Sequence, residues 1–173
     1  MDKRQQFNGL EKVNEYRAKI DANTDTYMED LFIKDKGLDL LKTLRFGQSG
    51  YDPLFEESTN FIEQTNQTFT YIVCLKAVEY LLALYPGKLF YVNFGTESGY
   101  DVESKDGEVI CECFSATAPD SNKKLAKDTE KISKNIVAKY KYVIYYASDP
   151  KPKHVLNIRK KYPEINIITL PTI

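Results

Sequence analysis

The stretch that decides the fold is Gly99-Tyr100-Asp101-Val102-Glu103, a polar turn at Lys105-Asp106-Gly107, and then Val109-Ile110-Cys111-Glu112-Cys113-Phe114-Ser115-Ala116. Asp-Gly between two segments rich in β-forming residues is typical of a hairpin turn. The sequence therefore predicts paired strands over 100–103 and 108–117. Each strand carries one carboxylate, Asp101 in the first and Glu112 in the second, at about the same distance from the turn. We expect these two side chains to be cross-strand neighbours.

Side-chain alternation then decides what surrounds Glu112. Ile110 and Phe114 share its face of the strand, and Cys111 and Cys113 point to the other face. Two carboxylates held close together repel unless a cation lies between them. Oxygen ligands with open coordination positions suit Mg²⁺, which retains waters and bridges to phosphate. A salt-bridged or solvent-facing pair of acids is the alternative interpretation.

The segments around the hairpin alternate between strand and helix. Apolar stripes and buried runs predict a helix, three strands, a helix, a strand, a helix and a strand, over 67–84, 88–94, 100–103, 108–117, 122–139, 142–147, 152–161 and 165–170. This order predicts an α/β (α+β) fold, with a mixed central sheet and flanking helices. In the helix over 122–139, we expect Leu125, Thr129, Ile132 and Ile136 to face inward and the lysines to face outward.

The N-terminal third is predicted to be mainly helical. Helices are expected over 3–21 and 26–46, the second including Leu31 and Phe32 and broken near Asp35-Lys36-Gly37. Residues 54–66 are ambiguous. We predict a helical region over 1–66, packed on an α/β core over 67–173, with both parts in one compact domain.

Composition limits the classes of function. The 173 residues carry a formal net charge of −1, but residues 120–161 hold 12 Lys and Arg against 4 Asp and Glu. That imbalance fits a polyanion bound on one side of the protein, or else ordinary solvated helix faces. A single histidine, His154, argues against histidine-based catalysis. Cys74, Cys111 and Cys113 lack a zinc-ligand spacing and are expected to be packed, reduced thiols.

The sequence also bears on location. The N-terminus lacks the apolar region of a signal peptide, and no run approaches the roughly 18 apolar residues of a membrane span. We therefore expect a soluble, cytoplasmic protein without a membrane partner.

The element order and the residues Gly99-Tyr100-Asp101 and Glu112-Cys113-Phe114 resemble the PD-(D/E)XK nuclease superfamily, which includes many restriction endonucleases. The resemblance covers roughly residues 67–173. It implies an αβββαβ core, a metal-binding role for Asp101, and a role for Glu112 as the acid of the second half-motif. The sequence departs from the pattern at Phe114, where the family usually carries lysine.

Some members of that superfamily carry the lysine on the following helix, which here offers Lys124 as first choice and Lys123 as second. A long lysine side chain can reach back over the strand ends. The resemblance also implies that an acid of the first core helix, Glu79, contributes to the metal site. Glu97, just before the hairpin, is a weaker candidate.

The function implied by the resemblance is a Mg²⁺-dependent DNA endonuclease, of restriction or defence type, with Mn²⁺ as a possible substitute. DNA phosphates would lie against basic residues such as Lys127, Lys131 and Lys134. The N-terminal helices would supply base contacts or the surface of a homodimer. The alternative is a catalytically inactive, nuclease-like binding or accessory protein, for which Phe114 argues. A purely structural α+β protein is a third interpretation.

Overall fold

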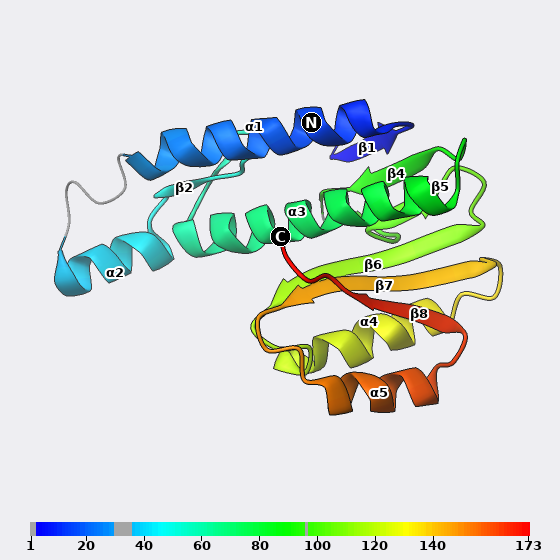
Figure 1. Ribbon diagram of the computed structural model, residues 1–173. Helices are drawn as coiled ribbons and strands as arrows, with labels where there is room; N and C mark the ends of the chain where they lie inside the picture. The colour runs from blue at the N-terminus through cyan, green and yellow to red at the C-terminus, as the bar shows by residue number, and fades with distance from the viewer. Residues whose placement is uncertain (1–2, 30–35, 96) are drawn as a thin grey trace.

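The computed structural model describes residues 3–29, 36–95 and 97–173, which form a six-stranded sheet and a separate two-stranded sheet. Helices cover both faces of the larger sheet (Figure 1). The elements, in chain order, are β1 (Arg4–Phe7), α1 (Leu10–Glu29), α2 (Gly37–Phe46), β2 (Gly50–Tyr51), β3 (Ser58–Thr59), α3 (Phe61–Leu84), β4 (Phe90–Asn93), β5 (Val102–Ser104), β6 (Val109–Ala116), a 3-10 turn (Ser121–Lys123), α4 (Lys124–Ser133), β7 (Tyr140–Ala147), α5 (Pro152–Lys161) and β8 (Ile165–Thr169).

The large sheet is mixed, as the sequence predicts. Its strand order is β1-β4-β5-β6-β7-β8. Strands β1, β4, β5 and β6 pair in antiparallel fashion, whereas β6, β7 and β8 pair in parallel. Each parallel connection contains a helix, α4 between β6 and β7 and α5 between β7 and β8. The predicted order of helix, three strands, helix and strand is therefore the order from α3 to β7.

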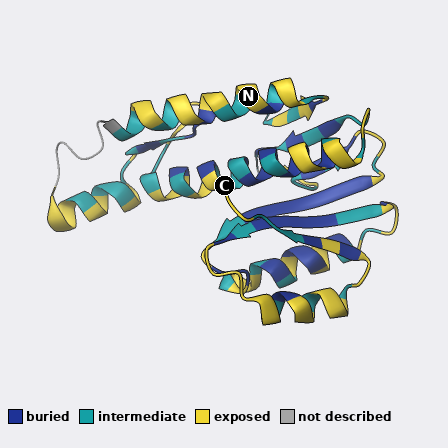
Figure 2. Cartoon of the chain, in the orientation of Figure 1, coloured by how far each residue is buried: buried dark blue, intermediate teal, exposed yellow. Residues whose placement is uncertain are grey.

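The two faces of β6 belong to two different cores. Cys111 and Cys113 pack in the core that includes α3, while Ile110 and Phe114 pack in the core that includes Leu125 of α4. Figure 2 shows this band of buried residues running through the sheet and the inner faces of α3 and α4. The predicted alternation along the strand is confirmed. The three cysteines, Cys74 on α3 among them, are buried free thiols, as predicted.

Helix α3 is the central helix of the fold. Its N-cap is Asn60, whose side chain accepts a hydrogen bond from the Glu63 backbone N–H at 2.9 Å. Among the described helices, α3 alone is long and apolar enough to cross a membrane. Here it packs against β6 and α1 with nine buried residues, as a core helix does.

The N-terminal segment differs from the prediction. The expected helix over 3–21 is wrong at its start, because Arg4–Phe7 form β1 and pair with β4 at the edge of the sheet. Phe7 is fully buried, in edge contact with Tyr16 at 5.1 Å between ring centroids. The predicted N-terminal region thus adds a strand to the sheet of the predicted core. Helix α1 begins only at Leu10 and continues to Glu29.

The second predicted helix of this region is described only in part. Leu31, Phe32 and Asp35 lie outside the described residues, and α2 begins at Gly37. No side chain of α2 is buried in the structure, and Leu38 and Phe46 are largely exposed. These apolar side chains of α2 therefore face solvent, whereas Leu40 and Leu44 on the same helix are half-buried.

The helix predicted over 122–139 is shorter than expected. Asn122 and Lys123 have positive φ angles of 51° and 57°, which separate the 3-10 turn from α4. Helix α4 ends at Ser133, and the Asn135 side chain then accepts hydrogen bonds from two following backbone N–H groups at 2.8 and 2.7 Å. Ile136 therefore lies beyond the helix and is 95% exposed, so the prediction that it faces inward is wrong.

Candidate active site at the end of the β5–β6 hairpin

The two carboxylates lie where β5 separates from β6. The antiparallel register pairs Glu103 with Ile110 and Val102 with Cys111. One step further along this register places Asp101, just before β5, opposite Glu112. Beyond this point β6 is paired only with β7, as far as Ala116. The register therefore makes Asp101 and Glu112 cross-strand neighbours, as expected from the sequence.

Asp101 is held by the backbone of β6. Its Oδ2 atom accepts a hydrogen bond from the Cys113 backbone N–H at 2.7 Å, so the side chain satisfies a donor that β5 no longer reaches. Burial raises the pKa of the Asp101 carboxyl, and the hydrogen bond from Cys113 and the charge of Lys124 oppose that rise. One carboxylate oxygen is thus fixed in the sheet, while Oδ1 makes no hydrogen bond to a described residue.

Glu112 is the more deeply buried acid, with 3% of its surface exposed. Its Oε1 atom lies 2.6 Å from the Lys131 ammonium, which also donates to the Gly99 carbonyl at 2.8 Å. Burial first and the charge of Asp101 second raise the pKa of Glu112 to about 7, against the opposing effect of Lys131. A buried carboxylate next to a second one is stabilised by added positive charge.

Helix α4 supplies the charges that face this pair. Lys124, Asp128 and Lys131 follow the spacing i, i+4 and i+7, which places them on one face of a helix. The Lys124 ammonium lies 2.9 Å from the Asp128 carboxylate and 5.8 Å from the centroid of the Phe114 ring. Partial burial lowers the pKa of Lys124, but its hydrogen bond to Asp128 and the charges of Asp128, Asp101 and Glu112 outweigh this effect and raise the pKa above its usual value. The Lys124 ammonium therefore remains charged beside the carboxylates.

Asp128 is the member of this cluster that the sequence analysis missed. It is 5% exposed, and burial raises the pKa of its carboxyl against the effect of Lys124. The available signal was its spacing of four residues from Lys124 and three from Lys131. The sequence predicts outward-facing lysines in this run, and Asp128 instead lies buried on the inner edge of the helix.

Phe114 occupies the place at which the resembling family carries lysine. Its ring is buried and stacks on Tyr145 with centroids 4.9 Å apart and planes 8° from parallel. A lysine at this position would remove the ring stack on Tyr145. It would also place an ammonium group in an apolar core. The nearest positive charge comes instead from Lys124, above the ring.

Not every predicted site residue lies in this cluster. Glu79 forms an ion pair with Arg17 of α1 at 3.5 Å and lines a different cavity, beside Gly87. Lys123 is exposed in a left-handed conformation before α4, and its side chain makes no ion pair or hydrogen bond within the described residues. The structure brings Lys124 to the carboxylates but leaves Lys123 and Glu79 out.

The three lysines predicted to contact DNA divide into two groups. Lys127 is exposed on α4, and Lys134, the exposed residue that caps the C-terminus of this helix, pairs with Glu130 of α4 at 2.9 Å. Lys131 instead reaches Glu112. Its first partner is thus a carboxylate of the candidate site.

The carboxylate oxygens of Asp101 and Glu112 suit a hard divalent cation that takes only a few of its ligands from the protein. Within the described part of the chain, no three His, Cys, Asp or Glu side chains converge in the manner of a preformed metal cage. Magnesium needs no such cage, since one or two carboxylates with waters and substrate phosphate suffice. Asp101 Oδ1 and Glu112 Oε2 have no hydrogen-bond partner among the described residues, so both oxygens are free for this role.

Comparison with family models, with curated proteins and with solved structures found no match for this chain. The function proposed below therefore depends on the chemistry of the site.

Proposed function

We propose that the protein is a divalent-metal-dependent nuclease that hydrolyses DNA phosphodiester bonds, of the PD-(D/E)XK type and of restriction or defence function. The observation that carries the proposal is the placement of Asp101 opposite Glu112 at the end of the β5–β6 hairpin, with the Lys131 ammonium 2.6 Å from Glu112. Carboxylates that can hold a metal ion, with ammonium groups beside them, are recurrent parts of sites for phosphoryl transfer.

Asp101 and Glu112 are the residues that would hold Mg²⁺ or Mn²⁺. When bound there, such an ion supplies a Lewis acid for the scissile phosphate and lowers the pKa of a coordinated water. The Cys113 backbone N–H orients the Asp101 carboxylate through its 2.7 Å hydrogen bond. Glu112 enters the site from the rigid centre of the sheet, because β6 pairs with strands on both sides up to this region.

The lysines of α4 would stabilise negative charge on the substrate. Lys131 has a half-exposed side chain, so its ammonium can leave Glu112 and move toward a phosphate. Asp128 holds the Lys124 ammonium near Phe114, where the usual lysine of the resembling family is absent. The two lysines thus take the place of one strand lysine.

DNA would approach the exposed side of α4 and α5. Lys127 of α4 and Lys134, which caps that helix, are exposed, and α5 ends in the basic run Arg159-Lys160-Lys161. Phosphate contacts of this kind position the strand without reading its sequence. A homodimer also remains part of the proposal, and it is supported by exposed apolar side chains on α2, such as Leu38 and Phe46.

A second candidate is a nuclease-like binding protein without activity. The stacked rings of Phe114 and Tyr145 leave no lysine on β6 beside the acids. Lys131 also compensates part of the Glu112 charge that would otherwise attract a cation. Both observations favour a protein without cleavage activity.

A cleavage assay separates the two candidates. Supercoiled plasmid and linear duplex DNA are incubated with Mg²⁺ or Mn²⁺ and wild-type protein, Asp101→Asn or Glu112→Gln, with Glu164→Gln as the matched control on an exposed acid. The nuclease predicts cutting by the wild type and the control, and at least a hundredfold loss in both site variants. Cation and DNA binding without cleavage would favour the inactive binding protein.

A further inference from the structure

The Lys131 ammonium lies in a cation site formed by Glu112, by the Gly99 carbonyl and by the Tyr100 ring. It donates hydrogen bonds to Glu112 Oε1 at 2.6 Å and to the Gly99 carbonyl oxygen at 2.8 Å. It also lies 5.4 Å from the centroid of the Tyr100 ring, within the range of a cation–π contact. A carboxylate oxygen, a carbonyl oxygen and an aromatic face all attract positive charge, whatever ion carries it.

The backbone of this cation site is shaped to present the Gly99 carbonyl. Gly99 has a φ of +132°, a conformation that residues with a side chain rarely adopt. The Tyr100 hydroxyl accepts a hydrogen bond from the Asn135 side chain at 3.1 Å, which ties the ring to the segment after α4. The Lys131 side chain, by contrast, is 49% exposed. The lysine is therefore the part of this arrangement that is free to move.

A divalent cation held by Asp101 and Glu112 would compete with this ammonium group. Asp101 lies opposite Glu112 on the neighbouring strand, and Lys131 already neutralises the charge of Glu112. Like charges a few ångström apart repel strongly where the surroundings are partly buried. The ammonium and a divalent ion therefore cannot both contact Glu112, and the metal must displace the lysine.

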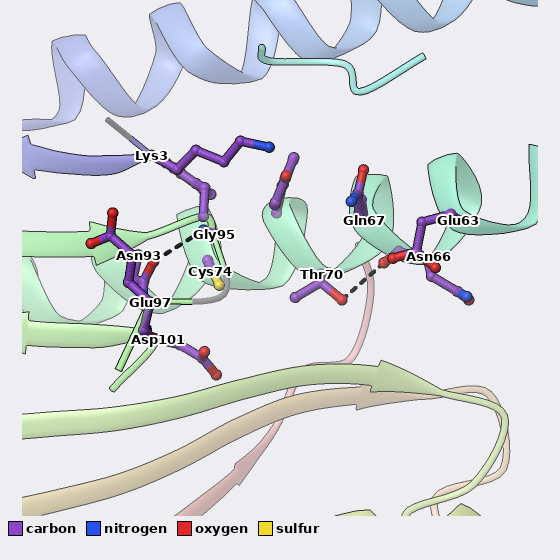
Figure 3. Close-up of a pocket in the computed structure, with 12 residues that line it drawn as sticks. Lys3, Glu63, Asn66, Gln67, Thr70, Cys74, Asn93, Gly95, Glu97 and Asp101 are labelled. Atoms are coloured by element: carbon purple, nitrogen blue, oxygen red, sulfur yellow. Dashed lines mark hydrogen bonds between the residues drawn. The ribbon is translucent and has the colours of Figure 1, made fainter. Parts of the chain in front are cut away.

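The two carboxylates differ in what covers them. Asp101 borders a cavity of about 380 Å³ on the α3 side of the sheet (Figure 3). The lining of this cavity includes the exposed residues Glu63 and Asn66, so solvent can approach Asp101 from there. The Glu112 side chain is 4% exposed and pairs with Lys131. Access of a metal ion to Glu112 therefore depends on the departure of the lysine.

We propose that Lys131 is a displaceable internal counterion that controls metal binding: its ammonium occupies the cation site until a divalent ion replaces it. The inference deepens the proposed nuclease function, because it rests on Asp101 and Glu112 binding a metal. The released ammonium stays beside the site on its four-carbon stem, where a phosphate of the nucleic acid can pair with it. Metal and nucleic acid thus favour each other's binding, since both require Lys131 to leave Glu112.

The test measures Mg²⁺ binding by isothermal titration calorimetry without nucleic acid, at pH 9, so that protons compete little for the carboxylates. Lys131→Met removes the ammonium and keeps much of the apolar stem. Lys105→Met, on the exposed turn at the other end of the hairpin, is the matched control with the same change in net charge. We expect Lys131→Met to bind Mg²⁺ about tenfold more tightly than the wild type, the effect that one adjacent charge has on an ionised group. The control should stay within about twofold of the wild type, because exposed charges are screened.

A second measurement follows the wild-type protein, so it does not depend on the folding of Lys131→Met. In protein labelled with ¹⁵N-lysine, the Lys131 ammonium is expected to give a distinct NMR signal because two hydrogen bonds hold it. The signal is assigned by its loss in Lys131→Arg. Saturating Mg²⁺ should abolish this signal, because the released ammonium exchanges its protons with water.

The outcomes separate this inference from the proposed nuclease function. Mg²⁺ binding that is unchanged or weaker in Lys131→Met, or a Lys131 signal that persists at saturating Mg²⁺, would overturn the inference and leave the nuclease standing. Tighter binding in the variant without DNA cleavage by the wild type would support the inference and refute the nuclease alone. No Mg²⁺ binding by the wild type or by Lys131→Met would overturn both.

Discussion

The raised pKa of Glu112 makes the stability of the protein depend on pH in a direction that can be tested. Folding raises this pKa from its usual 4.5 to about 7, first through burial and then through the charge of Asp101. Between these two values the folded protein binds more protons than the unfolded chain. The contribution of Glu112 is therefore fully present below pH 4.5 and is lost as pH rises through 7.

The size of the effect follows from the same two values. A change from 4.5 to about 7 corresponds to about 3 kcal/mol, as an upper estimate for one group coupled to its neighbours. Glu112→Gln keeps the shape of the side chain and an oxygen for Lys131, but it cannot ionise. We expect the variant to be more stable than the wild type by about 1–3 kcal/mol at pH 8 and to match it near pH 4.5.

Urea unfolding at several values between pH 4.5 and 8, followed by circular dichroism, measures this difference. Glu164→Gln is the matched control, because Glu164 is an exposed acid, and it should follow the wild type at every pH. Parallel curves for the wild type and Glu112→Gln would show that Glu112 ionises as a solvated acid does. The reasoning about a desolvated carboxylate pair would then fail.

Two further predictions concern α4. Lys124→Met leaves the buried Asp128 carboxylate without its partner at 2.9 Å. We expect this variant to be less stable than the wild type by about 1–2 kcal/mol. The loss is smaller than for a fully buried pair, because the Lys124 side chain is 43% exposed. Adding Asp128→Asn should recover most of that loss in urea unfolding, and no recovery would contradict a direct pair. Replacing Lys127 and Lys134 by Gln is expected to weaken DNA binding for all sequences alike and to reduce the slope of log K against log salt by about 2. A fluorescence-anisotropy titration at several salt concentrations measures this slope, and an unchanged slope would place DNA on another face.

The hairpin and its carboxylate pair could be predicted because their causes are local. The turn at Lys105-Asp106-Gly107 sets the register, and the alternation along β6 sets which face Glu112 takes. The α/β architecture followed from the same periodicities. Long-range information was not needed for either.

The charged side chains of α4 that lie near Asp101 and Glu112 could not be predicted in the same way. Which lysine reaches Glu112 depends on the direction in which α4 leaves β6, and the positive φ angles of Asn122 and Lys123 change that direction. The sequence favoured lysines one turn into the helix, whereas Lys131, two turns later, makes the contact. Asp128 was hidden for the same reason.

The N-terminal strand was missed because its stability comes from a distant partner. Arg4–Phe7 contain two glutamines and little apolar periodicity, and they form β1 only through pairing with β4, more than eighty residues along the chain. Phe7 then anchors the strand in the core. A helix of the same residues would have satisfied the local pattern equally well.

The central claim is that Asp101 and Glu112 together bind a divalent cation, and Mn²⁺ tests it most directly because the ion broadens NMR signals close to it. In a titration of ¹⁵N-labelled protein at pH 8, the account predicts that the backbone amide signals of Asp101, Glu112 and Cys113 broaden first. The same signals should persist in Glu112→Gln. Broadening that begins at exposed acids such as Asp106 and Glu108, or that is unchanged in the variant, would contradict the claim.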